Sequence, residues 1–252
     1  MGKLWIGGAA FDIDVVTPDG DTPPAQRPMS FKDIDKGAYA PSEPITAFYF
    51  HDKGAEGSAE QTYKYLKKVG FGVHGSIDSD GSFTQYADFS YVRTLHAGRV
   101  NDYSIGIEMT NTLIPNLKER KFLETWDNFL ARFNAKKRPI IVRDYRGLRQ
   151  KVYGHFPAQI ATAVKIANVT CQALRIPRRI LMNAKLGLPW GGLLPNLKVN
   201  PANKKKLIGE IADEYKHGVF GHFNVTNGHG DPGTDIFEAM IADGFEAKEV
   251  VV

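Results

Sequence analysis

Short, largely apolar runs of strand length recur through the first half of the chain. Residues 3–6 and 11–15 form two of them, and the second alternates between apolar and polar positions as a half-buried strand does. Residues 45–50 and 104–109 carry nearly continuous apolar side chains, which is typical of strands buried within a sheet. These runs predict a sheet whose strands come early in the sequence.

A hairpin is indicated between residues 73–77 and 83–87. The turn that joins these two strand-like runs ends in Asp80 and Gly81, and an Asp-Gly pair between two such runs is a hairpin signal. We therefore expect the two runs to pair antiparallel.

The second half of the chain changes to the period of a helix. Pro157 stands in the favoured first position of a helix, and apolar side chains follow at helical spacing to Leu174. Cys171 lies on this stripe, so we interpret it as a small buried hydrophobe and not as a nucleophile. The predicted helices are residues 58–70, where Ser58 and Gln61 form a capping box, and residues 122–133, 157–174, 203–217 and 234–242.

Two proline-rich stretches divide the sequence. Residues 17–44 are typical of a long loop, which makes residues 1–44 an N-terminal arm packed on the main domain. Residues 45–252 form that domain, with a second proline-rich loop inserted at about 176–202. Because strands come early and helices late, we predict an α/β fold with a mixed central sheet flanked by helices.

The composition excludes several classes of protein. The 252 residues are 42% hydrophobic and 24% charged, close to the averages of soluble globular proteins, and no apolar run approaches the roughly 20 residues that cross a bilayer. The first ten residues lack the long apolar stretch of a signal peptide, which predicts synthesis and initial retention in the cytoplasm. The single cysteine, Cys171, excludes an internal disulfide framework and a thiolate-rich zinc cluster.

The charge balance is mildly basic. The net charge is +4, from 32 basic and 28 acidic residues. This excess favours anionic partners but does not choose between nucleic acid, teichoic acid and the carboxylates of peptidoglycan. Because the chain has no arginine-rich tract and no basic run interleaved with aromatic residues, we do not expect a nucleic-acid partner.

Two of the seven histidines stand at the ends of predicted strands. His51 ends the run 45–50, and His222 follows another short apolar run, with Asp231 nine positions later (231 − 222). Two imidazoles and a carboxylate suit zinc, and three protein ligands leave a fourth position for water. The long separation of His51 from His222 is unlike a local zinc motif, so the residues alone favour a structural role for either histidine taken singly.

Four segments of the sequence form a pattern together. They are Phe48-Tyr49-Phe50-His51; His74-Gly75-Ser76-Ile77-Asp78-Ser79-Asp80-Gly81; His96-Ala97-Gly98 with Asn101-Asp102-Tyr103-Ser104-Ile105-Gly106-Ile107-Glu108; and Gly221-His222 with Asp231-Pro232-Gly233. In this order they resemble the zinc-dependent N-acetylmuramoyl-L-alanine amidases, whose fold is shared with peptidoglycan-recognition proteins and phage T7 lysozyme. The resemblance covers residues 45–111 and 155–240 and implies the same α/β fold.

The resemblance implies a zinc cofactor and a role for four residues. His51, His222 and Asp231 match the metal ligands of the family. Glu108 matches the acidic residue that takes a proton from the zinc-activated water and passes it to the leaving amine. Without the resemblance, the favoured interpretation of Glu108 is a charge that faces solvent at the end of a strand.

Two positions depart from the family pattern. Many members have a lysine two residues before the aspartate ligand, where its charge stabilises the oxyanion, and this chain has His229 there. His229 can donate a hydrogen bond or, when protonated, a positive charge, so we predict a catalytic role, with a metal ligand as the alternative. Phage members carry a tyrosine where this chain has Val73, which favours Glu108 as the proton-transfer group, as in the bacterial cytoplasmic amidases.

Three further residues lie in segments that line the substrate groove of the family. His74, His96 and Asn101 are therefore predicted to bind substrate or to support the site. A packing role for His74 and a turn-capping role for Asn101 are the alternatives. His155 precedes a helix and is interpreted as structural, while Asp52, beside the first candidate ligand, either orients that ligand or faces water.

The predicted function is hydrolysis of the amide bond between N-acetylmuramic acid and the L-alanine of the peptidoglycan stem peptide by a monomeric zinc enzyme. A phage endolysin and a cytoplasmic peptidoglycan-recycling amidase both fit the sequence. A non-catalytic peptidoglycan-binding module is the alternative from another class. Recognition members of this fold commonly lose a zinc ligand, whereas all three positions are filled here, which favours the enzyme.

Overall fold

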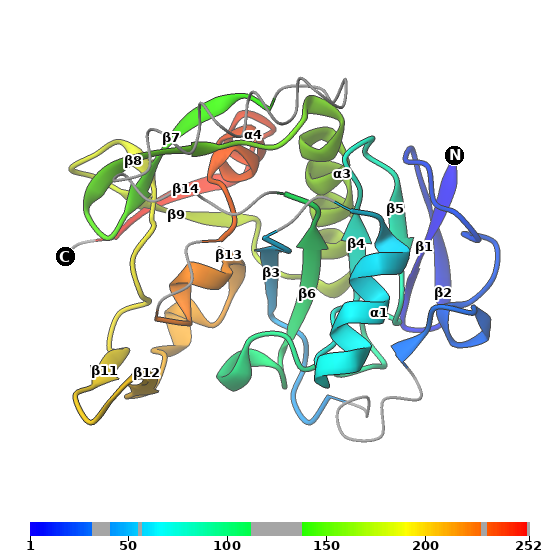
Figure 1. Cartoon of the computed structure of the whole chain (residues 1–252), viewed down its shortest axis with the longest axis horizontal. Helices are drawn as coiled ribbons and strands as arrows, with labels where there is room; N and C mark the ends of the chain where they lie inside the picture. The colour runs from blue at the N-terminus through cyan, green and yellow to red at the C-terminus, as the bar shows by residue number, and fades with distance from the viewer. Residues whose placement is uncertain (32–40, 55–56, 112–137, 228–230, 251–252) are drawn as a thin grey trace.

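The centre of the molecule is a five-stranded mixed sheet (Figure 1). The computed structural model describes residues 1–31, 41–54, 57–111, 138–227 and 231–250. Across the sheet the strands are β13 (Gly218–Gly221), β3 (Ala47–Asp52), β6 (Ser104–Met109), β4 (Gly75–Ile77) and β5 (Phe83–Gln85). The first four run parallel, and β5 returns antiparallel to β4. The carboxyl ends of parallel strands meet at one edge, so the residues that end β3, β6 and β13 come together there.

Alternation along β3 separates an apolar face of the sheet from a face that carries the candidate ligands. Phe48 and Phe50 lie in the main hydrophobic cluster with Ile166 of helix α3 (Pro157–Leu174) and Met240 of helix α4 (Asp235–Ala242). The odd-numbered residues of β3, which include His51, point to the opposite face. Helix α1 (Ala59–Val69) lies on this second side, in front of the sheet in Figure 1, whereas α3 lies behind it. The predicted α/β fold with helices flanking a mixed sheet is confirmed.

Local signals set the ends of the helices as predicted. Ser58 and Gln61 form the capping box of α1, with the Gln61 N–H donating to Ser58 Oγ (3.4 Å) and the Ser58 N–H donating to Gln61 Oε1 (3.1 Å). Gly70 ends the helix in the left-handed conformation that glycine tolerates, with φ of 75°. Pro157 opens α3, and Cys171 is buried on its inner stripe.

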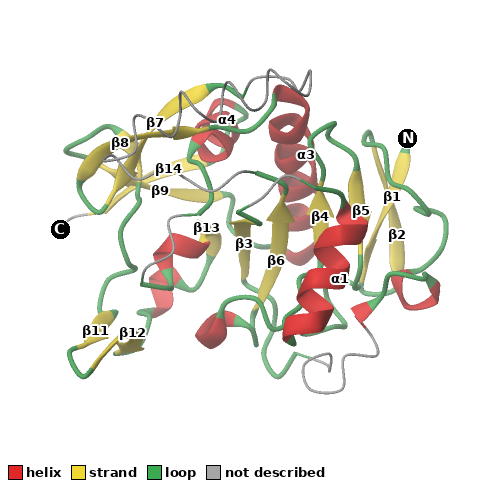
Figure 2. Ribbon diagram, viewed as in Figure 1, coloured by secondary structure: helices red, strands yellow, loops and turns green. Residues whose placement is uncertain are grey.

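The remaining strands surround the central sheet (Figure 2). The two strands predicted near the N-terminus are confirmed as β1 (Gly2–Ile6) and β2 (Ala9–Ile13). They pair antiparallel, and the apolar side of this hairpin joins the cluster under α3. The other strands are β7 (Ile140–Tyr145) and β8 (Leu148–Tyr153), which form a hairpin; β10 (Leu188–Pro189), β9 (Arg179–Asn183) and β14 (Glu246–Val250), which form a three-stranded sheet; and β11 (Lys198–Asn200) with β12 (Asn203–Ile208). Short 3-10 turns are Pro24–Gln26, Gly98–Val100, Asp213–Tyr215 and His222–Asn224.

The prediction of one long loop at 176–202 is wrong, because this segment contains β9, β10 and β11. Its prolines occupy positions where no sheet hydrogen bond is lost. Pro177 precedes β9, and Pro189 lies in β10, the edge strand of its sheet. A proline at a strand end or on an edge strand is compatible with a sheet, so proline content alone overstated the loop.

The predicted helix at 203–217 is also wrong. The chain continues from Asn203 as strand β12, which pairs antiparallel with β11. Gly209 follows with φ of 98°, a left-handed conformation that a right-handed helix cannot pass through. Only the short 3-10 turn Asp213–Tyr215 is helical in this segment.

The predicted helix at 122–133 lies outside the described residues and stays a prediction. The helix predicted at 234–242 is confirmed as α4. Among the helices that the structure describes, none has the length and apolar character needed to cross a membrane.

Candidate metal centre and active site

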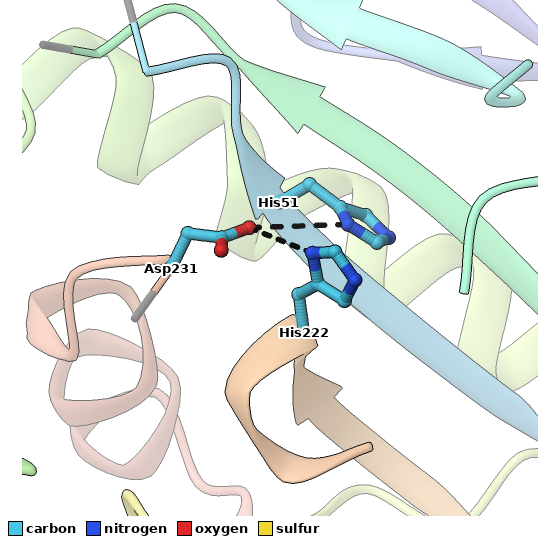
Figure 3. A group of neighbouring side chains, drawn as sticks. All are labelled: His51, His222 and Asp231. Atoms are coloured by element: carbon cyan, nitrogen blue, oxygen red, sulfur yellow. Dashed lines mark hydrogen bonds and ion pairs between the residues drawn. The ribbon is translucent and has the colours of Figure 1, made fainter. Parts of the chain in front are cut away.

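The side chains of His51, His222 and Asp231 converge at the carboxyl edge of the central sheet (Figure 3). One potential ligand atom from each residue lies within 4.8 Å of the other two. Oδ2 of Asp231 is 3.1 Å from Nδ1 of His222 and 4.0 Å from Nδ1 of His51. Three residues chosen from distant parts of the sequence therefore form one group.

The pairing of two parallel strands explains how the histidines meet. Gly221 of β13 lies opposite Phe50 of β3, so the next residue along each chain is a histidine at the same height. The rings of His51 and His222 lie with their centroids 4.5 Å apart. Asp231 reaches them from the loop before α4, and its Oδ2 accepts a hydrogen bond from the backbone N–H of Asp52 (3.3 Å).

The chemistry and spacing of this group fit a zinc ion. Two imidazole nitrogens and a carboxylate oxygen are common zinc ligands, and bonds of about 2.1 Å in a tetrahedral site place the ligand atoms roughly 3.4 Å apart. The separations of 3.1 and 4.0 Å lie on either side of that value. The side chains of His51, His222 and Asp231 are 4%, 13% and 13% exposed, so the group is shielded but reachable from solvent.

A chain of hydrogen bonds determines which nitrogen of His51 carries the proton. Ser104 Oγ lies 2.5 Å from the carbonyl oxygen of Val100, which can only accept, so the hydroxyl proton is donated there. Ser104 Oγ must then accept from Nε2–H of His96, 3.0 Å away. Burial, followed by the nearby imidazoles, lowers the pKa of His96 well below its usual value, so the ring is neutral and its Nδ1 is an acceptor. His51 Nε2, 3.0 Å from that atom, must donate to it, so Nδ1 of His51 is the unprotonated nitrogen and faces Asp231.

Gly106 makes room for this arrangement. A Cβ atom at this position of β6 would lie 2.5 Å from Cγ and 2.6 Å from Nδ1 of His96. Any side chain at Gly106 would therefore displace the His96 ring, whose Nδ1 lies 3.0 Å from Nε2 of His51. The His96 ring packs directly on Gly106, and this contact sets the distance of the ring from the sheet.

Glu108 lies next to the candidate ligands on the neighbouring strand. It stands opposite His51 in the register between β3 and β6, and it lines the same pocket. Burial raises the pKa of Glu108 to about 8, and the carboxylates of Asp231 and Asp52 contribute to the rise. A carboxyl group whose pKa is close to neutrality can both accept and return a proton near pH 7.

A pocket of about 690 Å³ opens above these residues. Its inner end is formed by the candidate ligands and Glu108, and Lys53 contributes a positive charge to its lining. The outer part is apolar and includes Tyr65 and Phe71, whose side chains remain 56% and 57% exposed. The pocket therefore joins a polar inner end, formed by the candidate ligands and Glu108, to an aromatic wall.

The predicted substrate-binding residues occupy different environments. His96 and Asn101 line the pocket, so a substrate role remains a prediction for both. Asn101 also accepts hydrogen bonds from the backbone N–H groups of His96 and Ala97, at 3.0 and 2.8 Å, and thereby shapes the turn that presents His96.

His74 is in a different position, because it has no exposed surface. Its Nε2 lies 2.7 Å from the carbonyl oxygen of Val92, and its Nδ1 accepts from the Gly106 N–H at 3.1 Å. Burial lowers the pKa of His74 to about 4, so the ring is neutral. Direct contact with a substrate is not open to it, and the packing role is the one that its surroundings fit.

His229 lies outside the described residues, so its predicted catalytic role stays a prediction.

The hydrogen bond between His155 and Asp52 was not predicted from the sequence. His155 is buried behind the site, where it bonds to the Asp52 carboxylate. The available signal was strand alternation, since Asp52 must point to the opposite face from His51, toward the start of α3.

The fold and the site define a mixed α/β protein with a candidate metal centre at the carboxyl edge of its sheet. The family model described as N-acetylmuramoyl-L-alanine amidase matches residues 41–187. This is more than half of the 252 residues, and the chain belongs to the N-acetylmuramoyl-L-alanine amidase family. The match spans His51, His96 and Glu108, and it ends before His222 and Asp231.

Solved structures similar to the chain have low sequence identity to it. The N-acetylmuramoyl-L-alanine amidase LysC from Clostridium intestinale URNW is 13% identical, covering 81% of this chain and 88% of its own, with a TM-score of 0.42. A selenomethionine derivative of AmpD is 16% identical, covering 91% and 96%, also with a TM-score of 0.42. The amidase AmiD from E. coli, solved with a muramyl-peptide substrate, is 16% identical, covering 70% and 55%, with a TM-score of 0.34. No curated protein sequence matches the chain.

Proposed function

We propose that this protein is a zinc-dependent amidase that cleaves the bond between the lactyl group of N-acetylmuramic acid and the L-alanine of the peptidoglycan stem peptide. The observation that carries the proposal is the convergence of His51, His222 and Asp231 beside Glu108 at the inner end of an open pocket. Membership of the N-acetylmuramoyl-L-alanine amidase family supports the choice of substrate and bond.

The proposed mechanism assigns the metal to the three converging side chains. Zinc held by Nδ1 of His51, His222 and a carboxylate oxygen of Asp231 would polarise the scissile carbonyl and lower the pKa of a water molecule. Glu108 takes the proton of the attacking water and returns it to the nitrogen of the departing alanine. The positive charge of a bound ion would lower the pKa of Glu108 from about 8 and so favour its basic form at neutral pH.

The hydrogen bonds that run from Ser104 through His96 to His51 support the proposed metal site. These hydrogen bonds keep the proton of His51 on Nε2 and hold the ring with Nδ1 toward Asp231. We assign His229, two positions before Asp231, to stabilisation of the oxyanion by a hydrogen bond or a positive charge, as proposed from the sequence.

We further propose that the substrate is the intact wall and that the protein acts as a phage endolysin. The net charge of +4 supports binding to an acidic polymer, and the exposed aromatic side chains of Tyr65 and Phe71 supply a surface for sugar or peptide beside the reaction centre. A recycling amidase would act instead on soluble muropeptides, which makes the two roles separable by substrate.

The test is digestion of purified peptidoglycan followed by mass spectrometry of the products. We expect stem peptides with a free N-terminal L-alanine and glycan strands with unsubstituted lactyl groups, and far slower release of these products by the Glu108→Gln variant. Cleavage of a glycosidic or peptide bond would overturn the proposed activity. Binding without cleavage, in protein loaded with zinc, would instead identify a recognition module. Faster turnover of soluble muropeptides than of intact sacculi would overturn the endolysin role.

A further inference from the structure

A buried imidazole connects two carboxylates directly behind the candidate metal centre. Nε2 of His155 lies 2.8 Å from Oδ1 of Asp52, and Nδ1 lies 2.7 Å from Oδ1 of Asp235. The side chains of His155, Asp52 and Asp235 are 0%, 2% and 9% exposed. We call these three residues the Asp52–His155–Asp235 bridge.

The geometry of the bridge specifies its protonation. Carboxylates accept hydrogen bonds, so both ring nitrogens of His155 must donate, and the ring is an imidazolium between two anions. Burial alone would lower the pKa of His155, but Asp235 and Asp52 outweigh this effect and raise the pKa to about 10. The positive charge of His155 is therefore fully buried behind the candidate metal centre.

Asp52 of the bridge forms hydrogen bonds to the segment that carries Asp231. Oδ2 of Asp52 accepts a hydrogen bond from the backbone N–H of Gly233 at 3.2 Å, and the N–H of Asp52 donates to Oδ2 of Asp231 at 3.3 Å. Asp52 thus holds the Asp231–Gly233 segment at both of its ends. A Cβ at Gly233 would lie 2.9 Å from Oδ1 of Asp235 and 3.2 Å from Cε1 of His155, so the segment rests on the bridge without a gap.

Asp52 is itself fixed by more than one partner. Besides His155 and Gly233, Nδ2 of Asn111 donates to Oδ2 of Asp52 at 3.0 Å. At the other end, Asp235 is the first residue of α4 and accepts the backbone N–H of His155 at 2.6 Å. The bridge therefore ties the end of β3 to the starts of α3 and α4, and the Asp231 segment lies between these elements.

We propose that His155 is a positioning residue of the metal centre, which acts through Asp52 to hold the Asp231 carboxylate at ligand distance from His51 and His222. The positive ring keeps Asp52 turned toward Gly233. Without it, Asp52 and Asp235 would be two buried carboxylates with no cation between them, and the Asp231 segment would lose its support. The consequence is a weaker metal site even though every ligand is still present. This inference rests on the proposed function, because it takes the three converging side chains to be metal ligands.

The test compares the zinc dissociation constants of two bridge variants with that of the unaltered protein. In His155→Gln the cation is removed, and in Asp235→Asn a single charge is removed while the shape is kept. Competition with a chromophoric chelator should show zinc binding about 10- to 100-fold weaker in His155→Gln, the range seen when support behind a metal ligand is lost, and a smaller loss in Asp235→Asn. The absorption spectrum of the cobalt-substituted protein should change as well, since the position of the Asp231 oxygen changes.

A matched control separates positioning from general stability. Ile166→Ala removes side-chain volume from the buried stripe of α3, far along the same helix from His155. It should lower the melting temperature and leave both the zinc dissociation constant and the cobalt spectrum unchanged. Activity of His155→Gln at limiting zinc should be low and should recover as zinc is added.

The outcomes distinguish this inference from the function on which it rests. Zinc binding by His155→Gln and Asp235→Asn within twofold of the unaltered protein would overturn the bridge alone, as would an equal loss of affinity in Ile166→Ala. Failure of the unaltered protein to bind zinc would overturn the metal centre and the bridge together. If His155→Gln does not fold, unchanged zinc affinity and cobalt spectrum in Asp235→Asn would overturn the bridge.

Discussion

Nε2 of His51 lies 3.0 Å from Nδ1 of His96, and the proton between them belongs to His51. This assignment follows from the Ser104 hydroxyl, which gives its proton to the Val100 carbonyl and so requires the proton of His96 on the far nitrogen. A proposed metal ligand is thus held in one tautomer by a serine two hydrogen bonds away.

Removal of that serine hydroxyl should weaken the metal site. In Ser104→Ala the Nε2–H of His96 loses its acceptor, and the ring is free to adopt the other tautomer. We expect zinc to bind about tenfold more weakly, with a loss of roughly 1–3 kcal/mol in the free energy of unfolding from the unpaired buried donor. Chelator competition and urea unfolding measure the two effects.

Thr170→Val is the control for this change. The Thr170 hydroxyl is buried in α3 without a hydrogen-bond partner among the described residues, so its removal costs no bond. Zinc affinity should be unaltered there. Equal zinc affinities in Ser104→Ala and the unaltered protein would show that the serine does not set the tautomer.

A methyl group at Gly106 should disturb the same ring by contact. The new Cβ would lie 2.5 Å from Cγ of His96, so the ring must shift from the position in which it pairs with His51. We expect Gly106→Ala to lose both thermal stability and zinc affinity. In Gly75→Ala the new Cβ would meet the Phe83 ring at 2.4 Å, away from the site, which should cost stability without loss of affinity. Parallel melting curves and zinc titrations of the two variants check this contrast.

Glu108→Gln should separate chemistry from metal binding. The amide keeps the size of the side chain but cannot take a proton, so kcat should fall by about 10²- to 10⁴-fold, while the zinc content stays near one ion per chain. Single-turnover hydrolysis and elemental analysis give the two values. Turnover at the rate of the unaltered protein would remove Glu108 from the mechanism.

The pH dependence of stability should report the charged state of His155. The folded pKa of about 10 lies above the ordinary value of 6.5, so the bound proton stabilises the folded state. This contribution is complete below about pH 6.5 and disappears as the pH rises through 10. In metal-free protein, the difference in unfolding free energy between the unaltered chain and His155→Gln should therefore shrink from pH 7 to pH 10. A difference that stays constant over this interval would show that His155 is neutral in the fold.

The aromatic wall of the pocket should affect substrate binding more than folding. Tyr65 and Phe71 are 56% and 57% exposed, so Tyr65→Ala and Phe71→Ala should leave the melting temperature within a few degrees, while KM rises several-fold. Tyr91, which is 61% exposed and does not line the pocket, is the matched control. A KM that rises equally in Tyr91→Ala would assign the effect to general surface hydrophobicity.

The sequence was sufficient for the elements whose signals are local. Capping at Ser58, the proline at the start of α3 and the Asp-Gly turn before β5 each act within a few residues, and each prediction is confirmed. The parallel strands could be recognised because buried β3 and β6 are nearly uniform apolar runs.

Elements that depend on distant pairing were misassigned or missed. Strand β9 lies between prolines and is stabilised by β14, which comes more than sixty residues later (246 − 179). In the hairpin of β7 and β8, Arg146 and Gly147 both have positive φ, at 55° and 82°, but an arginine at the first position gives no sequence signal for this turn. The local sequence of β9 does not indicate that it pairs with β14, and the local sequence of β7 does not indicate that it pairs with β8.

The residues of the candidate site could be predicted from the sequence, but the hydrogen bonds that support them could not. The positions of His51 and His222 at strand ends could be predicted, and the family pattern supplied Asp231. The tautomer relay and the bridge at His155 could not, because they depend on ring orientations that only the packed sheet defines.

The register between β13 and β3 also determines when a metal can bind. His51 and His222 become neighbours only after the last strand of the sheet has paired with one formed far earlier in the chain. A slip of one residue along β3 would replace the histidine with the aspartate that follows it. The proposed metal site is therefore complete only when β13 has paired with β3, and a chain that ends before residue 222 lacks two of its three proposed ligands.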